Sequence, residues 1–68
     1  MNNFIELTLA SNYKSIHINY KHIISFKEYI AQYTKQAVTE ICMVGEKPII
    51  HVTESPETIL MKIDNLTN

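Results

Sequence analysis

Short runs in which apolar and polar side chains alternate constrain this chain more than any other feature. Segments 4–10 (FIELTLA) and 15–20 (SIHINY) both alternate, and polar Ser11 and Asn12 lie in the connection between them. A period of two places alternate side chains on opposite faces of a half-buried β-strand. Two such segments with a turn-forming connection predict an antiparallel hairpin.

Three further runs extend this pattern toward the C-terminus. Residues 21–30 (KHIISFKEYI) are rich in β-branched and aromatic side chains, residues 38–44 (VTEICMV) alternate, and residues 49–53 (IIHVT) follow the only glycine, Gly45. The sequence therefore predicts a mainly β protein (α+β) of five short antiparallel strands. They form either one small sheet or an SH3-like barrel, with one C-terminal helix.

Residues 25–38 (SFKEYIAQYTKQAV) fit two different structures. A Ser-x-x-Glu capping box opens the segment, and apolar side chains then recur at helical spacing. Alternatively, residues 24–29 form a strand that pairs with residues 37–44 across a polar loop at 31–36. The residues alone leave both structures open.

The C-terminal segment has the signals of a helix start. Ser55 is a typical N-cap, Pro56 suits the first helical position, and Glu57 adds a negative charge that the helix dipole favours. We expect this helix to cover the apolar face or open end that a small sheet leaves bare. Its apolar stripe is predicted at Ile59, Leu60, Ile63 and Leu66.

The chain is expected to form a single small domain over residues 1–68. A domain of this size buries only about 60% of its unfolded surface, so association with a second copy is a simple way to bury more apolar area. The single cysteine, Cys42, excludes an internal disulfide and fits a reducing compartment. The start MNNFIELTLA lacks the features of a signal peptide, and no apolar run has the length of a bilayer span. We therefore expect a cytoplasmic protein with no membrane contact.

The charge balance argues against nucleic acid as the main partner. Six lysines and no arginine face seven acidic residues, for a net charge of −1. Binding to phosphates normally needs a basic surface, and arginine is the usual reader of guanine edges. A protein partner is the favoured alternative.

No constellation in the sequence fits a catalytic or cofactor site. Cys42 lies in an alternating segment with Glu40 on the same face, which is a poor setting for a nucleophilic thiolate. The acidic residues show no paired spacing suited to acid–base chemistry, and one glycine is too few for a phosphate-binding loop. We expect a protein that is not an enzyme and that uses no cofactor.

His17 and His51 carry the one metal hypothesis. Each lies within a predicted strand on the face opposite its apolar neighbours, Ile16 and Ile18 for His17 and Ile50 and Val52 for His51. If the two strands are adjacent, the two imidazoles would come together. Zinc normally needs three or four ligands, and no recognised spacing adds Glu40 or Cys42 to the pair. Exposed histidines that bind no metal are therefore the favoured interpretation.

Four tyrosines are interleaved with lysines in the first half of the chain. Tyrosine is enriched in protein interfaces, although aromatic and basic side chains together also suit stacking on single-stranded bases. The tyrosines would equally well border a small core with their hydroxyls in water. The candidate interaction residues are Tyr29, Ile30, Tyr33 and Tyr13.

Three motifs spread over residues 4–63 form a pattern: an Ile-x-Leu-Thr strand, an Ile-Asn-x-x-x-Ile corner and a Val-x-Glu-Ser-x-Glu helix entry. The residues concerned are Ile5, Leu7, Thr8, Ile18, Asn19, His22, Ile23, Val52, Glu54, Ser55, Glu57 and Ile59. Through them the chain resembles the small FlbD-like proteins of flagella and similar short proteins of phages and mobile elements. It departs from that pattern at residues 30–37, where its connection is longer.

The resemblance implies a β-sheet with a helix, and it favours the hairpin over the helix at residues 25–38. It implies no established activity. We hypothesise a non-enzymatic, self-associating protein-interaction module, acting through an edge strand or through the tyrosine-rich segment 29–37. A phage or mobile-element accessory protein that inhibits a host protein is one version. The alternatives are a small nucleic-acid-binding barrel that uses tyrosine and lysine, and a sensor that binds a small ligand or metal.

Overall fold

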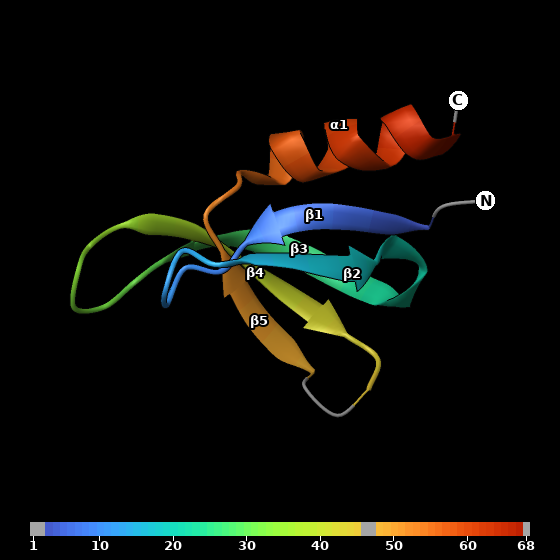
Figure 1. Ribbon diagram of the computed structural model, residues 1–68. Coiled ribbons are helices and arrows are strands. Elements are labelled where there is room, and N and C mark those ends of the chain that lie inside the picture. The colour runs from blue at the N-terminus through green and yellow to red at the C-terminus, as the bar shows by residue number, and fades with distance from the viewer. Residues whose placement is uncertain (1–2, 46–47, 68) are drawn as a thin grey trace.

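The computed structural model describes residues 3–45 and 48–67. Over these residues the fold class predicted from the sequence is confirmed, with five antiparallel strands followed by one C-terminal helix (Figure 1). A 3-10 helix, η1, connects β2 to β3. The elements are β1 (Phe4–Thr8), β2 (Ser15–Asn19), η1 (Tyr20–His22), β3 (Ile23–Ile30), β4 (Ala37–Met43), β5 (Ile49–Val52) and α1 (Pro56–Thr67).

The strands lie in two small antiparallel sheets. β1 pairs with β2 in the first, and the second has the order β3-β4-β5. A bridge between Leu9 and Val52 joins the two sheets, and beside it the Ala10 N–H donates a 2.9 Å hydrogen bond to the His51 carbonyl. The strands predicted from the sequence are therefore arranged as two sheets that meet at one end.

Residues 25–38 form a hairpin, and the helical alternative is wrong. β3 and β4 pair along their length, which places Phe26 opposite the fully buried Ile41. A helix would have buried a stripe containing Tyr29 and Tyr33, but these side chains are 39% and 94% exposed. Burial of Ile41 between its neighbours outweighs the local helical signals of the segment.

The corner between β2 and β3 depends on Asn19. Its side-chain Oδ1 accepts a hydrogen bond from the Lys21 N–H at 3.0 Å and caps η1. The predicted strand over residues 21–30 therefore starts later, at Ile23. The main chain of the corner is held further by a 2.9 Å hydrogen bond from the Val44 N–H to the His22 carbonyl.

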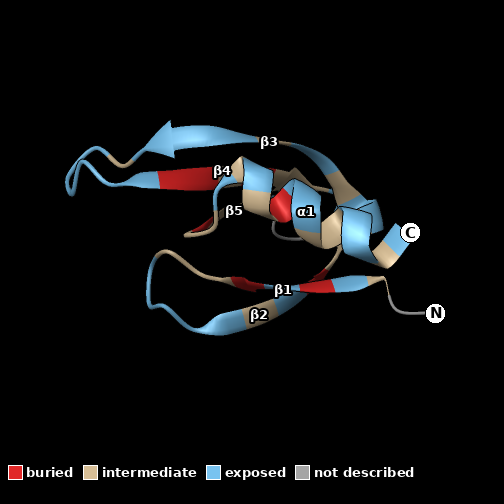
Figure 2. Ribbon diagram, turned by 90° about the horizontal axis from the view of Figure 1, so that it is seen from above, coloured by how far each residue is buried: buried red, intermediate tan, exposed pale blue. Residues whose placement is uncertain are grey.

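The core lies between the two sheets and beneath α1. Figure 2 shows its buried residues on strands of both sheets and on the helix, and shows α1 lying between β1 and β3. No single element supplies this core, so the two sheets and the helix stabilise one another. The buried cluster is Ile5, Leu7, Ile18, Ile41, Val52 and Ile59.

Helix α1 begins as the sequence predicts. The Ser55 Oγ accepts a hydrogen bond from the Thr58 N–H at 3.2 Å, and Pro56 is the first helical residue. Ile59 is fully buried, whereas Leu60 is 57% exposed, so the prediction that Leu60 belongs to the apolar stripe is wrong. Adjacent helical residues point about 100° apart, so the face centred on Ile59 leaves Leu60 in solvent.

Glu54 joins three parts of the chain just before α1. Its carboxylate accepts a hydrogen bond from the Thr8 N–H at 2.9 Å and another from the Thr8 hydroxyl at 3.0 Å. Its main-chain carbonyl accepts a hydrogen bond from the hydroxyl of Thr39, which is fully buried on β4. This residue therefore fixes the end of β1 and the middle of β4 against the chain that enters the helix.

The first prediction concerns the helix. We expect Ile59→Ala to lower the free energy of unfolding by about 2–5 kcal/mol, because it opens a cavity between the two sheets. A domain of this size has only about 3–5 kcal/mol in total, so the variant should be largely unfolded at 25 °C. Urea unfolding followed by circular dichroism measures the change. The matched control, Leu60→Ala, should stay within about 0.5 kcal/mol of the parent chain, and equal effects of the two changes would contradict this helix orientation.

The second prediction concerns Glu54. Glu54→Ala removes the acceptor of two hydrogen bonds from Thr8, and we expect it to lower the free energy of unfolding by about 2 kcal/mol. Glu57→Ala, a change three residues along in the first turn of α1, should cost less than about 1 kcal/mol, since it loses only a favourable dipole contact. The urea midpoint of each variant provides the comparison. A larger loss for Glu57→Ala would count against the joining role of Glu54.

Candidate functional site

The β1–β2 hairpin ends in a four-residue loop, residues 10–13. The Leu9 N–H donates to the Lys14 carbonyl and the Tyr13 N–H donates to the Leu9 carbonyl, both at 2.9 Å. The Asn12 Oδ1 accepts a hydrogen bond from the Lys14 N–H at 3.0 Å. Tyr13 has a φ of 59°, a left-handed conformation that glycine adopts at lower cost.

The β3–β4 hairpin repeats this geometry at residues 32–35. The Ala31 N–H donates to the Gln36 carbonyl at 2.9 Å, and the Lys35 N–H donates to the Ala31 carbonyl at 2.8 Å. The Thr34 hydroxyl accepts a hydrogen bond from the Gln36 N–H at 3.3 Å, and Lys35 has a φ of 58°. The two loops thus share one backbone conformation, and both place a long side chain at the left-handed position.

Both loops project from the same end of the molecule (Figure 1), and a surface groove of about 410 Å³ lies between them. Val38, only 6% exposed, lies in the groove wall between the loops. Tyr29 and His51 extend the lining along the strands. The first loop contributes Ala10, Ser11 and Tyr13. The second hairpin contributes Thr34 from its loop and the pair that closes the loop, Ala31 and Gln36.

A row of polar side chains crosses the sheet beside this groove. Lys27, Glu40 and His51 lie opposite one another on β3, β4 and β5. The Glu40 carboxylate is 3.2 Å from the His51 Nε2 and 3.8 Å from the Lys27 Nζ. The His51 ring lies 5.1 Å from the Tyr29 ring, centroid to centroid, at a tilt of 38°. Glu40 therefore holds His51 in place against the Tyr29 ring at the groove.

The structure places the four candidate interaction residues in three different settings. Tyr13 and Tyr29, from different hairpins, both line the groove. Ile30, at the end of β3, is 53% exposed and points to the opposite face of the strand from Tyr29. Tyr33 is 94% exposed in the β3–β4 loop and does not line the groove. Their part in binding stays a prediction.

Sequence reasoning missed Val38 and His51 as companions of the tyrosines. Alternation had already assigned Val38 and Glu40 to one face of their segment. Alternation does not show which residue of another strand lies opposite. The strand register supplies this information, and it pairs Tyr29 with Val38 and Glu40 with His51.

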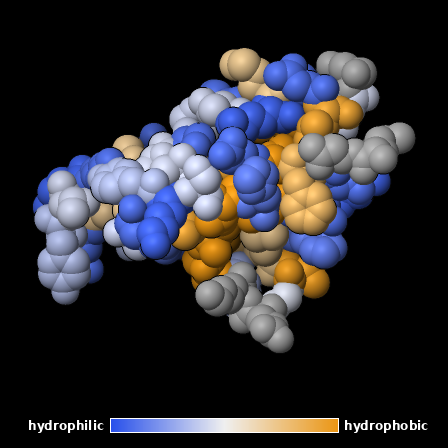
Figure 3. Space-filling view, in the orientation of Figure 1, coloured by the Kyte–Doolittle hydropathy of each residue, from blue (hydrophilic) through white to orange (hydrophobic). Residues whose placement is uncertain are grey.

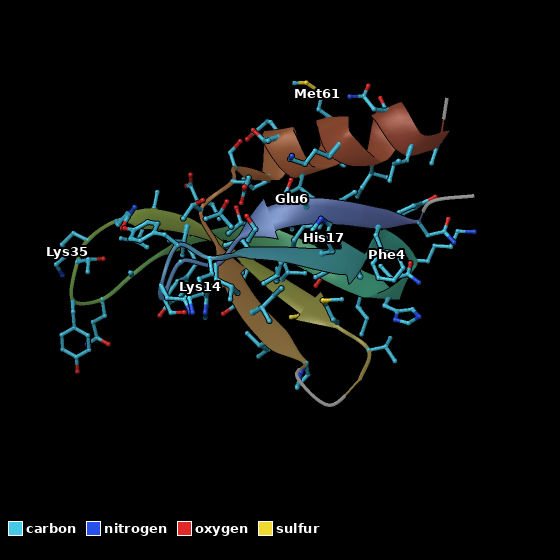
Figure 4. All side chains as sticks on the ribbon, in the orientation of Figure 1. Phe4, Glu6, Lys14, His17, Lys35 and Met61 are labelled. Carbon is cyan, nitrogen blue, oxygen red and sulfur yellow. The ribbon has the colours of Figure 1, made fainter. Side chains whose placement is uncertain are left out.

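The two histidines of the metal hypothesis lie in separate sheets. His17 is opposite Glu6 in the β1–β2 sheet, as Figure 4 shows, whereas His51 belongs to β5. Within residues 3–45 and 48–67, no three His, Cys, Asp or Glu side chains are grouped to hold a metal ion. The cross-strand imidazole pair is therefore not formed.

Comparisons with protein-family models, with curated proteins and with solved structures found no match to this chain. In the part of the chain that the structure describes, no helix is both long enough and apolar enough to cross a membrane. The surface is therefore interpreted from its own chemistry.

The third prediction tests the strained loop position. A left-handed conformation costs a non-glycine residue about 1–2 kcal/mol, and replacement by glycine removes this cost. The replacement also loses about 0.4–1 kcal/mol of stability, because glycine gives the unfolded chain more conformational freedom. We expect Tyr13→Gly to raise the free energy of unfolding by about 0.5–1 kcal/mol in urea titrations. Ser11→Gly, in the same loop but outside the left-handed region, should lower it. A loss of stability in Tyr13→Gly would show that packing of the tyrosine ring outweighs the backbone cost.

Proposed function

We propose that the protein is a non-enzymatic protein-interaction module that self-associates through the free edge of β3. One observation carries the proposal: six of the eight residues of β3 are exposed, and within the described chain this strand pairs only with β4. Its second edge therefore offers unpaired N–H and C=O groups to another strand.

The composition of β3 supports strand addition. Natural edge strands are usually protected by proline, by bulges, by charged side chains or by being short. β3 has eight residues and no proline, and its one irregularity lies at its start, between Ile23 and Ser25. Its two charged residues, Lys27 and Glu28, cancel, so an identical strand meets no net repulsion. Ile30 adds an apolar side chain that is 53% exposed at the end of this edge.

Self-association would also stabilise a domain of this small size. A core supplied by so few side chains is marginal, and a second copy adds buried area without any covalent link. Two copies that pair through β3 would join their three-stranded sheets into one continuous sheet. We place this module in the cytoplasm, where its single thiol, Cys42, stays reduced. A host protein with a free sheet edge would fit the same strand, in line with the resemblance to phage and mobile-element proteins.

The fourth prediction tests this edge. Ile30→Lys adds a positive charge that no acidic residue of β3 balances, so two copies of the strand would repel each other and pairing would be blocked. We expect the parent chain to show the mass of an oligomer by light scattering at high concentration, and Ile30→Lys to show the mass of a monomer. Leu60→Lys is the matched control, because Leu60 is equally exposed, at 57%, but lies on α1.

Two results would contradict the proposal. The first is a parent chain that stays monomeric at every concentration. The second is an Ile30→Lys variant that associates as the parent does. Circular dichroism of both lysine variants confirms that any loss of association is not a loss of fold.

A further inference from the structure

We propose that the groove between the two hairpin loops binds an extended acidic peptide that inserts one apolar or aromatic side chain. This goes beyond self-association, because the groove opens on the sheet face and at the loops, not at the free edge of β3. Its occupant is a peptide segment of another protein, identified by carboxylates that flank the inserted side chain.

The size and lining of the groove indicate that the inserted side chain of the peptide is apolar or aromatic. Its volume, about 410 Å³, falls in the range of about 300–1,000 Å³ that holds small ligands or single side chains. The lining includes the buried Val38 and the methyl groups of Ala10 and Ala31. Tyr13 and Tyr29 add aromatic surface from both hairpins. An apolar side chain between these rings leaves water and keeps the tyrosine hydroxyls near the peptide main chain.

The charges around the groove indicate that the residues flanking the inserted side chain are acidic. Lys14 and Lys35 lie on the two loops at the groove end of the molecule (Figure 4), and Lys27 lies beside Tyr29 on the same strand face. Among the described residues of this sheet face there is one carboxylate, Glu40, and it is already paired with Lys27 and His51.

Positive charge predominates on this sheet face and on the two loops. Among the described residues there, Lys14, Lys27 and Lys35 meet one carboxylate, Glu40, whereas the chain as a whole has a net charge of −1. This face is therefore positive in an acidic protein. In Figure 3 the loops on the left are mostly hydrophilic, and the hydrophobic side chains in view lie over the centre and right, among hydrophilic ones.

The loop conformations support a binding role for the side chains they carry. Both left-handed positions have a long side chain, Tyr13 and Lys35, where glycine would be less strained. Strained backbone positions are concentrated at functional sites, where the side chain contacts a ligand or partner. Tyr13 is 64% exposed, so little of its ring is used by the core.

A peptide fits these observations better than single-stranded nucleic acid. Stacking on tyrosine suits both, but nucleic acid brings a phosphate at every residue and normally needs a basic surface along its length, whereas this chain has a net charge of −1. A short peptide places its carboxylates only where the three lysines are.

The test uses a five-residue peptide with blocked ends, in which a central phenylalanine is flanked by two glutamates on each side. Amide resonances of the isotope-labelled protein are followed as peptide is added. We expect saturable shifts at Tyr13, Val38 and His51 and in the loop at 31–36, weaker at high salt because ion pairs at the surface are screened. A peptide with serine in place of phenylalanine, and one with lysines in place of glutamates, should bind at least about tenfold more weakly.

Two variants of the protein locate the site. Tyr13→Gly suits the loop backbone and should weaken binding about tenfold without unfolding the chain. Lys35→Ser should weaken it about threefold at low salt. Lys62→Ser, on α1, is the matched control and should bind the peptide as the parent does.

Three outcomes would overturn the inference. They are no shifts at the groove amides, equal affinity for the serine peptide, and tighter binding of oligothymidylate than of the acidic peptide. The Ile30→Lys variant separates this inference from self-association, because Ile30 does not line the groove. Peptide binding by that variant that is unchanged, or tighter because of the added positive charge beside Tyr29 and Ala31, supports the groove whether or not the parent chain forms oligomers. Loss of binding in the folded variant counts against it.

Discussion

The junction at which the two sheets meet holds the rest of this structure in place. The sheets share one bridge, between Leu9 and Val52, and the Glu54 carboxylate adds two hydrogen bonds to Thr8 beside it. Each sheet alone is too small to bury its own apolar side chains. By tying β1 to the chain that enters α1, the junction directs Ile59 into the space between the sheets, where the core closes around it.

The same junction builds the candidate site. Each hairpin loop is closed by its own hydrogen bonds and would have its shape without the other. Their relative position comes from the hydrogen bond between the Ala10 N–H and the His51 carbonyl, which holds the first loop beside β5. His51 then contacts Tyr29 of the second hairpin, and the Glu40 carboxylate on the strand between them lies 3.2 Å from the His51 Nε2. The groove therefore exists only because the two hairpins pack against each other at the junction. A change that destabilises the junction should also disrupt the groove.

Local features of the sequence predicted most of the fold and part of the site. Alternation correctly predicted the strands, and the Ser55 cap and Pro56 marked the helix start. Residues 25–38 could not be decided locally, because a capping box and helical spacing coexist there with strand-forming ends. The inclusion of Leu60 in the buried stripe failed because spacing alone does not fix the direction in which a helix faces.

What the chain alone determines is which side chains share a face within each segment, since that depends only on the period of a strand or a helix. Which segments become neighbours, and in which register, is decided by burial and hydrogen bonding between residues far apart in the chain. Docking of β1 beside β5 therefore settles that His17 and His51 stay apart and that Tyr13 and Tyr29 line one groove. Tyr13, Tyr29, Lys14 and Lys35 were visible as residue types, but their gathering at one end exists only in the folded protein.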